Sequence, residues 1–183
     1  RAFDLLRAFA STLAWVTGVG VRYGVLELRQ LVDGVLQMTP PVSDLQIQPK
    51  KVDSSDLSST EELLSLVMSD EYLEWALDDF RTALRERGDT ARKRGRALIF
   101  LYRSIEWLKI CFGGESKLRG ELSITKKQLE AITKPANNRY YTRHAKKDAP
   151  PATAQELENA FENTKQILEQ YLDYLSSQAI NGA

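Results

Sequence analysis

Apolar residues recur at steps of three and four over most of the chain, which is the period of an amphipathic helix. The first such stretch covers residues 2–16 and ends before Thr17-Gly18. Residues 19–38 are different, because β-branched and aromatic side chains there alternate with polar ones. Within them Asp33-Gly34 stands between two apolar pairs, which is typical of a two-residue hairpin turn. The N-terminal part is therefore expected to form a helix and a short β-hairpin.

Residues 39–58 are rich in Pro, Ser and Asp, a composition that predicts a linker. Four helical segments follow. Three of them open with Ser or Thr and have Glu or Gln three residues later, the spacing of a capping box. These pairs are Ser59/Glu62, Thr125/Gln128 and Thr153/Glu156, and the other helix is expected to begin at Asp89. The pattern predicts a mainly α protein in which residues 1–38 end an upstream domain or form a flap and residues 59–183 form a helical bundle.

The composition narrows the class of protein. With 183 residues, of which 43% are hydrophobic, the chain can bury the core of one domain. No stretch approaches the ~18 uninterrupted apolar residues of a membrane span. Cys111 is the single cysteine and His144 the single histidine, so neither a disulfide nor a structural zinc site can form within one chain. We expect a cytoplasmic protein with no cofactor, no metal and no membrane contact, and the initial Arg1 indicates a piece of a longer polypeptide.

The formal net charge is zero, with 25 basic and 25 acidic residues, but the charges are segregated. Residues 61–79 carry seven acidic and no basic side chains, whereas residues 126–147 carry seven basic and one acidic. A second basic cluster lies at residues 92–96. These runs are either solvated or mutually paired faces, or the basic ones are built to bind phosphates.

The only histidine, His144, lies within the basic run at residues 126–147. Its neighbours in the sequence have side chains that can bind or polarise an oxygen anion. They are Asn137, Asn138, Arg139, Tyr140, Tyr141 and Arg143. Histidine exchanges a proton near neutral pH, and a guanidinium stabilises charge on phosphorus oxygens, so the pair is a minimal set for cutting RNA without a metal.

At this point the sequence resembles the HEPN superfamily, small helical bundles found in many toxin, abortive-infection and CRISPR-associated ribonucleases. Arg139, four residues and then His144 match its motif of an arginine followed by four to six residues and a histidine. Three segments are similar to those of abortive-infection members: the Asn-Asn-Arg sequence, the following Pro150-Pro151 turn and the helix containing Tyr102 to Glu106. The resemblance covers about residues 59–180 and implies a HEPN-like four-helix bundle that pairs as a homodimer.

The resulting hypothesis is a metal-independent endoribonuclease of a defence or toxin system that cleaves RNA by attack of the 2′-hydroxyl. His144 would be the general acid or base and Arg139 the transition-state stabiliser. The expected RNA- or phosphate-binding residues are Asn138, Tyr140, Arg143, Lys146 and Lys147, and the expected supporting residues are Glu106 and Asn137. The alternatives are a non-catalytic module that senses RNA or a nucleotide or dimerises, and a helical protein-interaction domain. An upstream sensor domain in the same polypeptide fits any of these.

The spacing also raises a geometric question. Residues five apart on an uninterrupted α-helix are separated by roughly 140° around its axis. Arg139 and His144 would then not share a face. Either the segment is irregular or a second protomer completes the site.

Overall fold

The computed structural model describes residues 2–17, 54–144 and 148–181, and this part of the chain is mainly helical with no β-strand. The helices are α1 (Ala2–Thr17), α2 (Ser54–Ser69), α3 (Glu71–Glu86), α4 (Ala91–Cys111), α5 (Glu115–Glu121), α6 (Lys126–Asn138) and α7 (Ala154–Asn181). The mainly α fold class is thereby confirmed. The expected β-hairpin at residues 19–38 lies outside the described residues.

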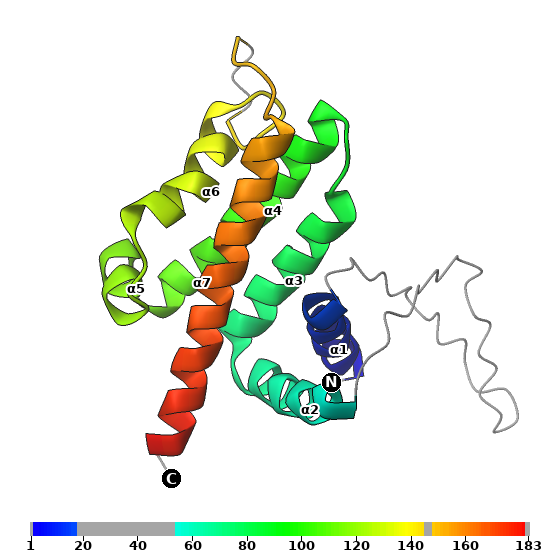
Figure 1. Cartoon of the computed structure of the whole chain (residues 1–183), viewed down its shortest axis with the longest axis vertical. Helices are drawn as coiled ribbons and strands as arrows, with labels where there is room; N and C mark the ends of the chain where they lie inside the picture. The colour runs from blue at the N-terminus through cyan, green and yellow to red at the C-terminus, as the bar shows by residue number, and fades with distance from the viewer. Residues whose placement is uncertain (1, 18–53, 145–147, 182–183) are drawn as a thin grey trace, which may run out of the picture.

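Four helices, α3, α4, α6 and α7, lie along one another in an elongated bundle (Figure 1). In it α4 packs against α3, α6 and α7, so α4 is the central helix. At one end α1 packs against α2 and α3, and α2 also contacts α7. Side chains with less than 2% exposure come from all four bundle helices and form much of the core. The largest are Leu73, Leu77, Leu98, Leu101, Ile105, Leu108, Leu129, Ile132, Ile167, Leu168 and Tyr171.

The start of the bundle differs from the prediction, which placed one helix between its start at Ser59 and the next helix at Asp89. Helix α2 already begins at Ser54, inside the segment expected to be a linker, so Ser59 is not an N-cap. The helix then breaks at Asp70, whose backbone is extended (φ −127°, ψ 108°) and whose Oδ1 accepts a hydrogen bond from the Leu73 amide at 2.7 Å. A carboxylate N-cap of this kind starts a new helix and sets its direction.

The other helix starts agree more closely with the sequence pattern. Thr125 and Gln128 form the expected capping box of α6, and Thr153 and Glu156 exchange the same two hydrogen bonds at the start of α7. Helix α4 is capped by Thr90, one residue beyond the expected Asp89. No described helix is long and apolar enough to cross a membrane.

Candidate functional site

The segment from Arg139 to His144 is a turn that follows α6. Helix α6 continues through the buried Pro135 and ends at Asn138, and Arg139 has an extended backbone (φ −103°, ψ 157°). The Arg143 amide then donates to the Ala136 carbonyl at 3.1 Å, and the Thr142 hydroxyl donates to the Arg139 carbonyl. The segment is therefore irregular, as the first of the two alternatives for the motif spacing predicts. We call residues 139–144 the histidine turn.

Arg139 forms an ion pair with the start of α7. Its Nε donates to Glu156 Oε1 at 2.9 Å, and the two side chains are 31% and 26% exposed. Burial, the largest single influence, raises the pKa of Glu156, but hydrogen bonds from Arg139 and Thr153 outweigh it and the net pKa is lowered. The motif arginine thus holds the histidine turn to the first turn of α7. The sequence indicated Glu156 only as a helix cap.

Arg143 lies on α4. Its Nη1 donates to Tyr102 Oη at 2.5 Å, and its guanidinium carbon is 4.7 Å from the centroid of the Tyr102 ring. Glu106, expected to support the site, lies beside Tyr102 and forms an ion pair with Lys109 at 3.0 Å. Burial, and then the negative charge of Glu106, raises the pKa of Tyr102. Arg143 itself remains exposed, so its guanidinium can still meet a ligand.

His144 is exposed and makes no hydrogen bond within the described part of the chain. Within the described residues no hydrogen bond joins His144 to Arg139, whose guanidinium instead binds Glu156. Tyr140 and Tyr141 have ring centroids 4.2 Å apart, with Tyr140 half-buried and Tyr141 44% exposed. The histidine therefore faces solvent among aromatic and cationic neighbours.

The remaining predicted residues are less informative. Asn138 is exposed at the end of α6, and the Oδ1 of Asn137 is buried with no hydrogen-bond partner among the described residues. Lys146 and Lys147 lie outside the described residues. No group of three or more His, Cys, Asp or Glu side chains that could hold a metal ion occurs in the described ranges.

Comparison with known proteins places the bundle in a family. A family profile described as the C-terminal domain of DUF8168, a domain of unknown function, matches residues 60–176. The chain belongs to this family. The matched range includes α3 to α6, the histidine turn and most of α7. Neither the curated proteins nor the solved structures gave a match.

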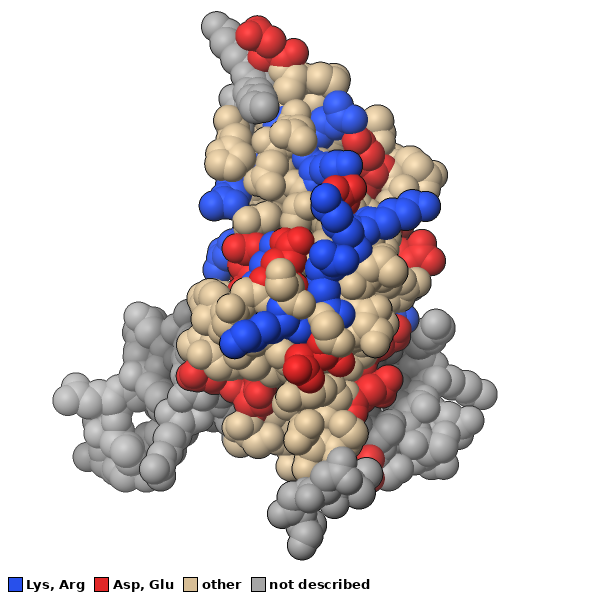
Figure 2. Space-filling view, turned by 90° about the vertical axis from the view of Figure 1, so that its left-hand side faces the viewer, with Lys and Arg blue, Asp and Glu red and all other residues tan. Residues whose placement is uncertain are grey.

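The surface charge of this DUF8168 C-terminal domain is more mixed than its sequence predicts. Figure 2 shows the side that carries α5 and α6, where basic and acidic side chains alternate. Lys126 and Lys134 both pair with Glu130, at 3.8 and 2.8 Å. In the second basic cluster Arg94 donates to the Ala152 carbonyl at 2.7 Å and Arg96 pairs with Glu86 at 3.1 Å. Ion pairs and hydrogen bonds with nearby acceptors therefore engage several of these basic side chains.

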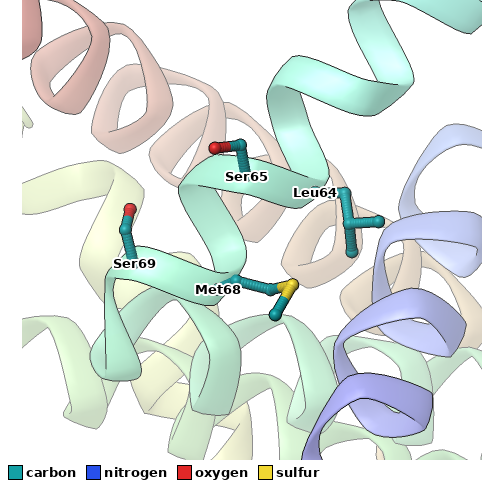
Figure 3. Close-up of a pocket in the computed structure, with 4 residues that line it drawn as sticks. All are labelled: Leu64, Ser65, Met68 and Ser69. Atoms are coloured by element: carbon teal, nitrogen blue, oxygen red, sulfur yellow. The ribbon is translucent and has the colours of Figure 1, made fainter.

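A pocket elsewhere on the DUF8168 C-terminal domain offers no comparable chemistry. It lies on α2 and is lined by Leu64, Ser65, Met68 and Ser69 (Figure 3). None of these side chains titrates near neutral pH, and none of the predicted site residues lines the pocket. The histidine turn is thus the better candidate for a functional site.

Proposed function

We propose that this domain is a metal-independent endoribonuclease whose reactive group is His144. The observation that carries the proposal is the exposed His144 directly after the exposed Arg143, on a turn tied to α6, α7 and α4. A histidine held on such a turn is accessible to a large ligand and has a positive charge beside it. This is the combination that proton transfer at a phosphodiester requires.

The reaction would proceed by attack of the ribose 2′-oxygen on the adjacent phosphorus. The bond between the 2′-oxygen and phosphorus forms and the bond between phosphorus and the 5′-oxygen breaks, which leaves a 2′,3′-cyclic phosphate and a free 5′-hydroxyl. His144 would accept the proton of the 2′-hydroxyl or donate one to the departing 5′-oxygen. The other transfer would use water or His144 of a second copy in the homodimer that the HEPN resemblance implies.

The assignment of the arginines follows from their partners. Arg139 is expected to keep a structural role because Glu156 already satisfies its guanidinium. Arg143 is the better candidate for stabilising the charge on the phosphorus oxygens, because its partner Tyr102 is neutral at pH 7 and the side chain is exposed. The proposed catalytic pair is therefore Arg143 and His144.

One observation favours a second candidate function, RNA or nucleotide binding without cleavage. The ion pair between Arg139 and Glu156 removes the motif arginine from the free cations of the site. A domain that binds phosphates with Arg143 alone would use the same surface and show no reaction.

An RNA cleavage assay in EDTA separates these functions. The wild-type protein is expected to cleave single-stranded RNA, and His144→Ala is expected to lower the rate by about 10²–10⁴-fold with an unchanged melting temperature. Arg143→Gln is expected to weaken both binding and cleavage. Lys134→Gln is the matched control. It also removes an exposed basic charge, but that charge lies on α6, where Lys134 pairs with Glu130.

Three results decide between the candidates. Loss of cleavage in His144→Ala but not in Lys134→Gln supports the enzyme. RNA binding that Arg143→Gln weakens, with no cleavage by the wild type, supports the binding module. Absence of both binding and cleavage in the wild type overturns the proposal and leaves the protein-interaction domain.

A further inference from the structure

We infer that Gly95 is a positioning residue that seats the histidine turn on α4. The inference deepens the proposed function and rests on it for its effect on RNA, but the contact itself is independent of any activity. Gly95 is buried within α4. A Cβ atom built on it would lie 2.4 Å from the carbonyl oxygen of Tyr141, 2.8 Å from the carbonyl carbon and 2.9 Å from the Tyr141 Cβ. Real Cβ atoms essentially never approach other atoms below 3.0 Å.

Glycine is an unfavourable choice inside a helix, because it loses more backbone freedom on folding than alanine does. Its presence at residue 95 is explained by the close approach of the turn backbone. Gly120 in α5 provides the contrast, since a Cβ there would meet nothing within 4 Å. The two helical glycines therefore differ in what an added side chain would touch.

Tyr141 cannot easily move away from Gly95. Its φ of 64° lies in the left-handed region, which is unfavourable for a residue with a side chain, so the surrounding structure must hold it there. On one side the Tyr140 amide donates to the Pro150 carbonyl at 3.3 Å, and on the other the Arg143 amide donates to the Ala136 carbonyl at 3.1 Å. The atoms that approach Gly95 are backbone and Cβ atoms, so a new rotamer of the Tyr141 ring would not relieve a clash.

The turn touches the same face of α4 a second time. Tyr102, which binds the Arg143 side chain, is seven residues after Gly95 and so lies on the same stripe of the helix, roughly 10 Å further along its axis. Between them Leu98 and Leu101 are fully buried in the core and fix α4 in place. A side chain at residue 95 would therefore displace the turn, and with it Arg143 and His144, before it displaced the helix.

The experiment compares Gly95→Ala with Gly120→Ala, which adds the same methyl group to a helix in open space. Hydrogen exchange of the Arg143 amide reports the position of the turn, and the affinity for a fluorescein-labelled single-stranded RNA reports the site. In Gly95→Ala we expect exchange to rise and RNA affinity to fall, each by about tenfold or more. In Gly120→Ala both are expected to stay within about twofold of the wild type, with a melting temperature that is unchanged or higher.

The double variant Gly95→Ala with Tyr141→Gly guards against a general loss of folding. Glycine at residue 141 removes one of the close contacts and tolerates a shifted backbone, so it is expected to restore at least part of the exchange protection and of the melting temperature. Unchanged exchange in Gly95→Ala, or no restoration in the double variant, overturns the inference. If the wild type binds no RNA, the proposed function fails while the exchange data still test the seat of the turn.

Discussion

The interface between α3 and α4 contains Asp79 from the acidic run, the histidine turn contains Arg139 and Arg143 from the basic run at residues 126–147, and the fold uses these charges in opposite ways. At the interface the acidic side chain takes part in packing. Asp79 is 5% exposed, accepts a hydrogen bond from the Trp107 indole at 2.8 Å and lies 3.3 Å from the Arg103 guanidinium. In the turn the basic side chains remain at the surface, and His144 has no partner among the described residues.

The difference between these two regions shows how to interpret a sequence in which acidic and basic residues are segregated. The acidic run does not form a face that meets the basic run, because Glu74 pairs with Arg7 and Asp78 with Arg81. The basic run is held by Glu130 and Glu156. Several charges in each region are thus paired with partners outside the other run, and what distinguishes the two regions is burial. Buried charge governs stability, whereas exposed charge is free to bind ligands.

The largest effect that tests this comparison is the pH dependence of stability at the interface. Burial raises the pKa of Asp79 from its ordinary value of 3.8 to about 6, against the lowering influence of Trp107 and Arg103. The folded protein then holds this proton more tightly than the unfolded chain does. The stabilisation is fully present below pH 3.8 and is lost as the pH rises through 6.

We expect this loss to reach up to about 3 kcal/mol between pH 4 and pH 7. Urea denaturation of the wild type and of Asp79→Asn across this range measures it, because asparagine keeps the acceptor but cannot titrate. The free energy of unfolding of the wild type, measured relative to that of Asp79→Asn, should rise as the pH falls from 7 to 4. A difference that is flat with pH would show that Asp79 is ionised normally in the folded state.

A smaller effect is expected from the donor to that carboxyl group. Trp107→Phe removes the indole N–H and leaves Asp79 buried without it, which costs about 1–3 kcal/mol of unfolding free energy. Trp75→Phe is the matched control, since the Trp75 ring packs 4.8 Å from that of Trp107 and no hydrogen bond from it to Asp79 is present. Equal losses in the two variants would mean that ring packing, and not the hydrogen bond, dominates at this interface.

Much of the helical fold could be predicted because its signals are local. The starts of α6 and α7 are set by Thr125 and Thr153, whose capping partners lie three residues away. The break between α2 and α3 was missed, because Asp70 interrupts a helical pattern whose apolar residues continue on both sides. Helix α5 was missed as well, since seven residues are too few to show a period.

The candidate site was less predictable because its contacts join distant parts of the chain. The sequence indicated Arg143 by residue type, and His144 by residue type and by the motif that it forms with Arg139. It assigned Arg139 to the ligand, but the Glu156 that binds this arginine is 17 residues away and is recognisable only as a cap. The contact between Gly95 and Tyr141 gives no local signal apart from a glycine inside a helix.

The smallest predicted effect tests whether the charge of Arg139 stabilises the fold, as buried charge does, or is free to bind a ligand. Glu156→Gln is expected to lower the free energy of unfolding at pH 7 by about 1 kcal/mol, because it weakens a partly exposed ion pair and the cap of α7. Since the pKa of Glu156 is lowered on folding, its contribution is present above pH 4.5 and is lost as the pH falls below that value. Glu158→Gln is the control on the same helix, because Glu158 and its partner Arg87 are each 47% exposed and should contribute little.

A double-mutant cycle with Arg139→Gln completes this test. If the guanidinium serves mainly to hold the histidine turn to α7, the two single variants should lose similar stability and show a coupling of about 0.5–1 kcal/mol. RNA affinity should then fall in Arg139→Gln only as far as it falls in Glu156→Gln. If Glu156→Gln instead tightens RNA binding while Arg139→Gln weakens it, the ion pair competes with the ligand. Arg139 would then join Arg143 as a phosphate-binding residue, and the ion pair with Glu156 would limit ligand binding as well as stabilise the fold.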